Sequence, residues 1–191
     1  TLSFFILVSI LVITCHCITF SCVPKRKVAL TFDDGPNPDL TPILLDRLLE
    51  ANVNASFFFT GSHAEQNPDI VKRAFNEGHD VGGHSYSHAN LTNLCTSNFK
   101  EFEFEVLESM NIIGNITGVH PTLFRPPYGA YDPCVEYWIQ ERYGYDLIMW
   151  NVGNVDWYFN NATIQNQVYL ASMPSSGGII TMHDKMSSTV E

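Results

Sequence analysis

Two stretches of the chain carry acids and histidines at spacings that suit hydrolytic chemistry. Asp33 and Asp34 are adjacent, and His84 and His88 lie four residues apart. Two neighbouring carboxylates stay ionised together only if a cation or a basic partner lies close by. Two imidazoles and one carboxylate can hold a divalent metal and leave positions open for water, as hydrolytic zinc sites do. Each stretch alone also has an ordinary explanation, a turn in the first case and surface or core histidines in the second.

Other polar residues could complete such a site. If Asp34 joins the two histidines as a metal ligand, Asp33 is left beside the bound water as a general base. Arg125 could hold Asp33 ionised through a charge-assisted hydrogen bond. His183, if oriented by Asp156, would have a raised pKa and could act as a general acid. The alternatives are a solvated arginine and a histidine at a strand end with no role.

Each of these residues follows an apolar segment that is typical of a buried strand. Amphipathic segments separate the strands, among them a helix expected to begin with Thr41 as its cap and Pro42 in its first turn. This alternation predicts parallel strands joined by crossover helices, so the polar residues would meet at one rim of a barrel. The predicted strands cover residues 27–32, 55–60, 79–82, 122–124, 147–152 and 178–182.

Length and composition indicate one folded domain. The chain has 191 residues, of which 45% are hydrophobic, and a formal net charge of −10. The negative charge argues against nucleic acid as a partner, because phosphate binding needs a basic surface.

The N-terminal segment is predicted to be a signal peptide whose start is missing, over residues 1–22, followed by one domain over 23–191. Residues 2–13 are almost all apolar, and this run is short for a membrane span. A membrane anchor is the alternative. We therefore expect a secreted protein or one at the cell surface or cell wall. Weak support comes from glycosylation acceptor sequences at Asn54, Asn90, Asn115 and Asn161.

The chain has five cysteines, and if Cys15 and Cys17 leave with the signal peptide, three remain, Cys22, Cys95 and Cys134. An odd number leaves one of them without a partner in this chain, and the sequence does not say which.

The order and spacing of five motifs resemble the NodB-type polysaccharide deacetylases of carbohydrate esterase family four, in the branch with the fungal-type chitin deacetylases. The resemblance runs from about Val28 to Asp184. It implies an α/β fold, a distorted (β/α) barrel of about seven parallel strands. The motifs lie at residues 31–35, 84–88, 125–128, 156–157 and 180–184.

The resemblance also implies a role for individual residues. Asp33 resembles the catalytic base and His183 the general acid. The other roles are metal binding by Asp34, His84 and His88, orientation of the base by Arg125, tuning of the acid by Asp156, and contact with the oxyanion or substrate by Tyr128 and Trp157.

By the same resemblance the chain would hydrolyse acetyl groups from N-acetylglucosamine residues. Chitin is the expected substrate, and peptidoglycan is the second choice. The metal would be Zn²⁺ or another divalent ion such as Co²⁺. We expect a monomer. The runner-up hypothesis is an inactive protein of the same fold that associates with a cell-wall or surface glycan, and a metal-binding structural protein is the third.

Two features depart from the family pattern. The fourth motif usually has another Asp three residues before Asp156, where this chain has Gly153, and the change could disturb the loop that carries Asp156 and Trp157. The chain also stops at Glu191, before the further helix that family members have, which predicts a truncated C-terminal part.

Overall fold

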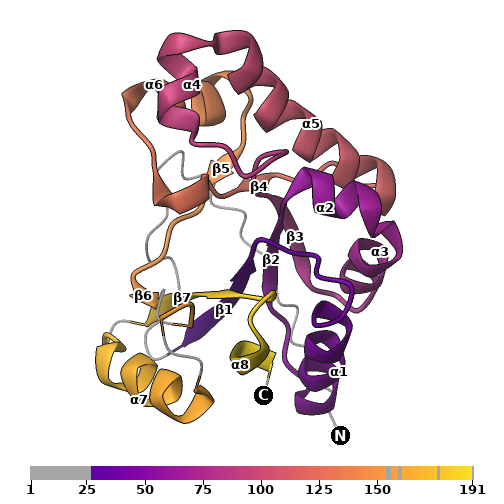
Figure 1. The fold of residues 1–191 in the computed structure, drawn as a ribbon, viewed down its shortest axis with the longest axis vertical. Helices are drawn as coiled ribbons and strands as arrows, with labels where there is room; N and C mark the ends of the chain where they lie inside the picture. The colour runs from indigo at the N-terminus through magenta and orange to yellow at the C-terminus, as the bar shows by residue number, and fades with distance from the viewer. Residues whose placement is uncertain (1–26, 154–155, 159–160, 176, 191) are drawn as a thin grey trace, which may run out of the picture.

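The structure is a computed structural model that describes residues 27–153, 156–158, 161–175 and 177–190 (Figure 1). The predicted signal peptide over residues 1–22 lies outside the described residues, as does Cys22. Within the described part of the chain, no helix is long and apolar enough to cross a membrane.

One sheet of seven strands organises the fold, with strand order β5-β4-β3-β2-β1-β7-β6. Every neighbouring pair is parallel, which confirms the predicted α/β fold. The sheet curls but stays open, because β5 and β6 are its two edges. The strands are β1 (Val28–Asp33), β2 (Ser56–Phe59), β3 (Asp80–Gly83), β4 (Leu123–Phe124), β5 (Asp146–Leu147), β6 (Val152–Gly153) and β7 (Gly178–His183).

Helices connect the strands and lie around the outside of the sheet (Figure 1). The helix predicted to begin at Thr41 and Pro42 is α1, and α2 begins at Gly61, two residues after β2 ends. The helices are α1 (Thr41–Ala51), α2 (Gly61–Gln66), α3 (Pro68–Asn76), α4 (Leu91–Ser97), α5 (Phe99–Thr117), α6 (Pro133–Glu136), α7 (Ala162–Ser172) and α8 (Ser187–Val190), with the short helical segments η1 (Pro127–Gly129) and η2 (Tyr137–Arg142).

The cap predicted for α1 was wrong. Leu40 occupies the cap position, and no side chain caps the helix there. Thr41 is instead the first helical residue, and its hydroxyl accepts a hydrogen bond from the Asn37 N–H at 2.7 Å. The same hydroxyl donates to Asp184 Oδ2 at 2.5 Å. Thr41 therefore ties the loop after β1 to the end of β7.

The single strand predicted over residues 147–152 is in fact two strands on opposite edges of the sheet. β5 pairs with β4, and β6 pairs with β7. Between them the chain crosses the buried side chain of Arg125, which donates hydrogen bonds to the carbonyls of Ile148 and Met149 at 3.2 and 3.3 Å. A buried guanidinium thus uses the backbone groups that a continuous strand would pair.

Among the described residues, two large apolar clusters fill most of the interior, and a third, small one holds Val152, Tyr169 and Ile180. One large cluster joins β1 and β2 to α1 and α3 around stacked phenylalanines, with the rings of Phe32 and Phe57 5.3 Å apart. The other large cluster packs α5 against β4 and β5 and includes Phe102 and Phe124, both fully buried. Cys95 and Cys134, whose pairing the sequence left open, form a disulfide between α4 and α6.

Candidate active site

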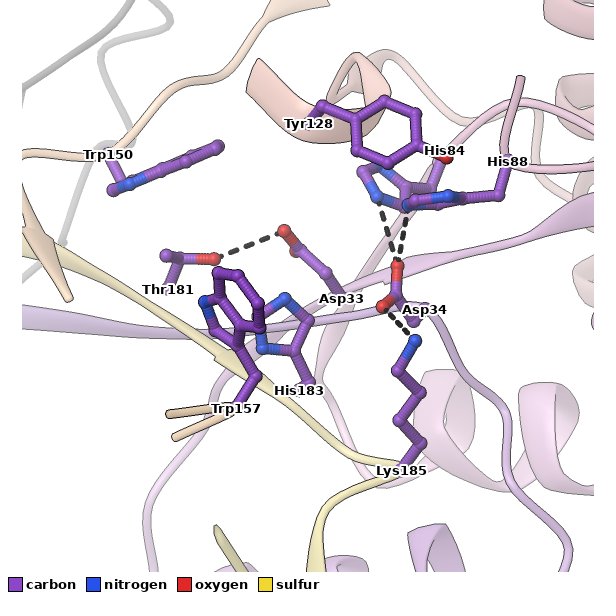
Figure 2. Close-up of a pocket in the computed structure, with 10 residues that line it drawn as sticks. All are labelled: Asp33, Asp34, His84, His88, Tyr128, Trp150, Trp157, Thr181, His183 and Lys185. Atoms are coloured by element: carbon purple, nitrogen blue, oxygen red, sulfur yellow. Dashed lines mark hydrogen bonds and ion pairs between the residues drawn. The ribbon is translucent and has the colours of Figure 1, made fainter. Parts of the chain in front are cut away.

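The carboxyl ends of the strands bring most of the predicted residues to the lining of one pocket of about 260 Å³ (Figure 2). The other two, Arg125 and Asp156, do not line it but contact Asp33 and His183, which do. Asp33 ends β1 and His183 ends β7, and the two are register partners in these parallel strands. His84 directly follows β3, and Arg125 directly follows β4. This is the convergence that the strand pattern predicted.

Asp33 is held by a buried cation. Arg125 Nη1 lies 2.7 Å from Asp33 Oδ1, and the Thr181 hydroxyl donates to Asp33 Oδ2 at 3.1 Å. Asp33 is 3% exposed and Arg125 is fully buried. Both carboxylate oxygens therefore have partners, as the sequence predicted for Arg125 but not for Thr181.

The guanidinium of Arg125 is fixed from several sides. Nη1 also donates to the Thr31 hydroxyl at 2.7 Å, and the ring of Phe58 lies 4.1 Å from its central carbon. Burial lowers the pKa of Arg125, but the neighbouring Asp33 carboxylate counters this effect, so the guanidinium stays charged. A cation held this rigidly fixes the position of the Asp33 carboxylate.

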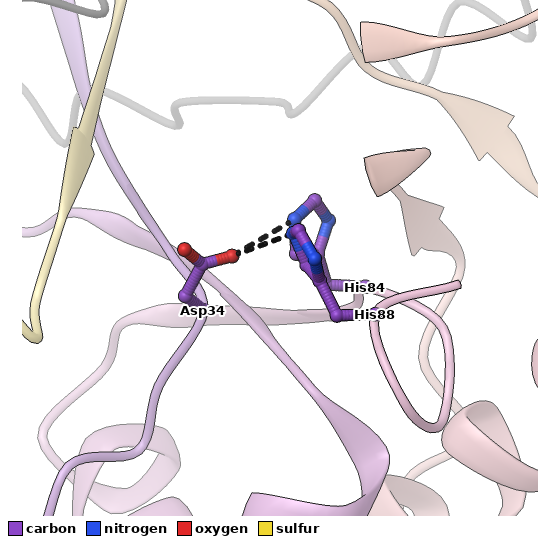
Figure 3. Close-up of side chains that lie close together, drawn as sticks. All are labelled: Asp34, His84 and His88. Atoms are coloured by element: carbon purple, nitrogen blue, oxygen red, sulfur yellow. Dashed lines mark ion pairs between the residues drawn. The ribbon is translucent and has the colours of Figure 1, made fainter. Parts of the chain in front are cut away.

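Asp34 faces a different set of partners (Figure 3). Its backbone leaves the strand with a φ of 77°, which turns the carboxylate toward the loop after β3. Oδ1 lies 3.3 Å from His84 Nε2 and 3.0 Å from His88 Nε2. The three ligand atoms all lie within 4.8 Å of one another, and Asp34 and His84 are buried.

The donor set fits a divalent metal. His84 Nδ1 lies 2.7 Å from the Arg125 carbonyl, which can only accept, so in the neutral ring Nδ1 carries the proton and Nε2 presents a lone pair. This lone pair points at a carboxylate oxygen, and Asp34 Oδ1 has no hydrogen-bond partner among the described residues despite the short distances. Facing lone pairs with an unsatisfied buried oxygen call for a cation between them.

Lys185 is one of the pocket residues that the sequence did not predict. Its Nζ lies 2.7 Å from Asp34 Oδ2, and its side chain is 50% exposed. Burial acts to raise the pKa of Asp34, but the two histidines, where their Nε2 atoms carry protons, and Lys185 outweigh burial and hold this pKa well below its usual range. The lowered pKa favours the carboxylate form of Asp34, which is the form that binds a metal.

His183 and Asp156 form the pair that the sequence predicted. The ring atom Nδ1 of His183 lies 2.8 Å from Asp156 Oδ1, and the backbone N–H of His183 donates to Asp156 Oδ2 at 2.6 Å. Thr189 of α8 also donates to Oδ2, at 2.9 Å. Burial works to lower the pKa of His183, but the fully buried Asp156 outweighs it and raises the pKa. The imidazolium is thus favoured beside Asp33.

Aromatic side chains form the walls of the pocket (Figure 2). Tyr128 is 67% exposed, has a φ of 63° and packs its ring 4.5 Å from that of His88. Trp157 is 52% exposed and lies beside Tyr158, with ring centroids 4.2 Å apart. Trp150 also lines the pocket.

Gly153 has a local structural reason. Its φ is 119°, and a Cβ there would lie 2.6 Å from the Thr181 carbonyl oxygen of the neighbouring strand. An aspartate could not occupy this position without a shift of β6 away from β7. Asp156 nevertheless contacts His183, so the glycine does not prevent the pair from forming.

The residues that sequence reasoning missed carry weak local signals. Thr181 and Trp150 lie in apolar segments, and their pocket contacts come from partners far away in the sequence. Lys185 follows the last motif by one residue, so a basic side chain next to the His183-Asp184 pair was the signal that could have pointed to it.

A family comparison agrees with this geometry. The family model described as polysaccharide deacetylase matches residues 21–148. The chain belongs to the polysaccharide deacetylase family. The matched part contains the group of Asp34, His84 and His88, the Asp33–Arg125 pair, and Tyr128.

Individual deacetylases of known name resemble the chain over most of its length. Peptidoglycan-N-acetylglucosamine deacetylase PgdA of Listeria monocytogenes is 43% identical over 166 residues, 85% of this chain and 34% of that protein. Chitin deacetylase 2 of Saccharomyces cerevisiae is 36% identical over 172 residues, 86% of this chain and 52% of that protein. The chain thus spans about a third to a half of these curated relatives.

The fold has close counterparts among solved structures. The structure of the peptidoglycan deacetylase PdaC from Bacillus subtilis superposes with a TM-score of 0.78 at 34% identity, over 87% of this chain and 78% of that one. The deacetylase fold that the motifs implied is therefore confirmed.

Proposed function

We propose that the chain hydrolyses the N-acetyl group of N-acetylglucosamine residues in a glycan and releases acetate, with the help of a divalent metal. The observation that carries this proposal is the geometry of the two adjacent acids. Asp33 forms an ion pair with Arg125 at 2.7 Å. Asp34 lies in the same pocket with its carboxylate close to the ring nitrogens of His84 and His88.

The metal would be held by Asp34, His84 and His88. When bound, a divalent ion polarises the acetyl carbonyl and lowers the pKa of water. Zn²⁺ suits two imidazoles and one carboxylate, and Co²⁺ or another divalent ion could take the same ligands.

Asp33 is placed to take a proton from the attacking water. Arg125 and the Thr181 hydroxyl hold its carboxylate in place, at 2.7 and 3.1 Å, so that it can accept this proton without first reorienting. Neither Arg125 nor Thr181 needs to move during the reaction, because both are buried.

His183 is placed to give a proton to the departing amine. It is the register partner of Asp33, so base and acid flank the same point from neighbouring strands. Asp156 on Nδ1 leaves the proton on Nε2 free for transfer and raises the pKa of the ring. The Tyr128 backbone N–H could hold the developing oxyanion, and the Trp157 ring could contact the sugar.

The names of both relatives point to the same sugar. N-acetylglucosamine is part of the name of the Listeria enzyme, and it is the repeating unit of chitin. The Listeria peptidoglycan deacetylase, at 43% identity, is more similar than the yeast chitin deacetylase, at 36%. The fungal-type branch expected from the motifs is therefore the weaker assignment. We propose N-acetylglucosamine in peptidoglycan as the first substrate to test and chitin as the second.

We propose an active enzyme over the inactive glycan-associated protein. The argument for inactivity was Gly153, yet the Asp156–His183 pair is intact beside it. We also propose that the domain works outside the cytoplasm. The Cys95–Cys134 disulfide supports this proposal, because disulfides persist in oxidising compartments.

Acetate release from peptidoglycan and from N-acetylglucosamine oligomers, with Zn²⁺, Co²⁺ or a chelator, tests the proposal. Asp33→Asn should lower turnover about 10²- to 10⁴-fold and keep metal affinity, since the base is removed but no ligand is lost. Asp34→Ala should lose the metal. Release that is absent at full metal occupancy from both glycans would sink the enzyme proposal. Comparison of the two glycans decides the substrate.

A further inference from the structure

The two histidines of the cluster lie on a loop with a strained backbone, over residues 84–88. Ser85 and His88 have φ angles of 59° and 64°. Residues with a side chain rarely adopt this left-handed conformation, and it persists only where surrounding contacts impose it. Contacts from other parts of the molecule must therefore hold the loop.

Some of these contacts come from the start of α2. The Gly61 N–H donates to the Ser85 carbonyl at 2.8 Å, and the Ser62 N–H donates to the Tyr86 carbonyl at 2.9 Å. Within the loop, the Ala89 N–H donates to Ser85 Oγ at 3.2 Å. These bonds fix carbonyls on one side of the loop and leave the N–H and hydroxyl of Ser87 to be satisfied elsewhere.

Glu105 of α5 satisfies both groups. Its Oε2 accepts from the Ser87 N–H at 2.8 Å, and its Oε1 accepts from the Ser87 hydroxyl at 2.5 Å. Ser87 lies between the two histidines in the sequence, so both oxygens of one carboxylate act on the centre of the loop. Charge-assisted bonds of this length are stronger than neutral ones.

Glu105 is an unusual residue to find inside the protein, since it is only 2% exposed. A buried carboxylate is costly unless hydrogen bonds replace the water that it has lost. Among the described residues, the two groups of Ser87 provide this replacement. The mechanism proposed above gives Glu105 no role, so its burial has another cause.

Two glycines let α5 approach closely enough for this contact. A Cβ at Gly61 would lie 2.9 Å from Ser109 Cα, and a Cβ at Gly83 would lie 2.5 Å from Met110 Sδ. Ser109 lies one helical turn after Glu105 and on the same face. The helix therefore packs directly on the start of α2 and the end of β3, where the loop begins.

We propose that Glu105 is a positioning residue for the metal-binding loop. Its carboxylate fixes Ser87 and so directs Nε2 of His84 and His88 toward Asp34 before any metal arrives. Glu105 touches neither the metal ligands nor the substrate and acts through the loop. The inference rests on the proposed metal site, and it adds a residue on α5 to the set that determines metal affinity.

Two measurements on the full 191-residue chain test this role. The first is Zn²⁺ affinity, measured by competition with a chromogenic chelator. The second is amide hydrogen exchange of residues 85–89 in the absence of metal. Glu105→Ala should weaken Zn²⁺ binding about 10- to 100-fold, as loss of outer partners of metal ligands does. It should also speed exchange of the Ser87 amide at least about tenfold. Glu105→Gln should lose less, because its amide can accept from the Ser87 N–H and donate to the hydroxyl.

Glu108→Ala is the matched control, a partly exposed acid on the same helix, and both readouts should stay at the wild-type level. A Glu105→Ala protein that melts earlier but keeps its Zn²⁺ affinity and its exchange rate would overturn the proposal. If Glu105→Ala does not fold, Glu105→Gln and Ser87→Ala carry the same test. If the wild-type protein binds no Zn²⁺, the proposed function fails, and hydrogen exchange alone decides whether Glu105 holds the loop.

Discussion

Asp33 and Asp34 are neighbours in the sequence and opposites in their surroundings. Asp33 is part of a closed region in which Arg125, Thr31 and Thr181 satisfy one another. Asp34 belongs to an open region, where Oδ1 lies near His84 and His88 but accepts no hydrogen bond from the described residues. The first region is satisfied by its own side chains, whereas the second leaves a buried oxygen for a cation such as the proposed metal.

The backbone explains how one peptide bond separates the two regions. Alternate residues of a strand point to the same face, so Thr31 and Asp33 both reach Arg125. Asp34 has left the strand with a φ of 77°, and its side chain turns toward the histidine loop. A tight turn after a strand can thus give two adjacent acids separate duties.

The largest effect should come from breaking the closed region. Arg125→Met leaves Asp33 buried without its cation, which should lower the free energy of unfolding by about 3–5 kcal/mol in urea titrations. Arg47→Met is the control, because Arg47 pairs with Glu50 on the surface and should change stability by about 0–1 kcal/mol. Equal losses in the two variants would remove the distinction between the regions.

A smaller effect should come from filling the open region. A Zn²⁺ concentration of 100 times the dissociation constant should raise the free energy of unfolding by about 2.7 kcal/mol, since the ion binds the folded state. In His88→Ala the same concentration should give almost no increase. An increase that survives this substitution would place the ion elsewhere.

Lys185 should matter for the metal and little for the fold. Its side chain is 50% exposed, so Lys185→Met should change the free energy of unfolding by less than about 1 kcal/mol. Zn²⁺ affinity should rise a few-fold, because an ammonium next to Asp34 repels a dication. A drop in affinity, measured by chelator competition, would mean that Lys185 serves to orient Asp34 instead.

The smallest effect should be the pH dependence of the His183–Asp156 pair. The pKa of His183 is raised in the folded protein, so the pair stabilises fully below the ordinary histidine pKa of about 6.5. This stability is lost as pH rises through the higher folded value. Urea titrations of wild type and Asp156→Asn should therefore differ most near pH 6 and converge at alkaline pH. A difference that grows with pH contradicts the assignment.

The sequence was sufficient for the residues whose position follows from strand ends. Asp33, His84, Arg125 and His183 each come directly after or at the end of a strand, and a parallel sheet brings such positions together. The alternation of strands and helices predicted the sheet for the same reason.

Contacts between distant segments were beyond this reasoning. Thr181 and Glu105 look like ordinary strand and helix residues, and their roles depend on register and on the closeness of α5. The split of residues 147–152 into two strands reflects the buried guanidinium of Arg125, which donates hydrogen bonds to the carbonyls of Ile148 and Met149. The Thr41 hydroxyl, which the sequence suggested as a helix cap, instead donates a hydrogen bond to Asp184.

The pairing of β1 with β7 has a consequence for how the molecule is made. The Thr31 hydroxyl bonds to the Ile180 carbonyl, a contact between residues 149 positions apart. Contacts of such long range form slowly in folding. A growing chain acquires Asp33 and the proposed metal ligands Asp34, His84 and His88 early, but it gains His183 only when nearly all of the described sequence has left the ribosome. An incompletely synthesised domain would carry the proposed metal ligands and still lack the proposed proton donor.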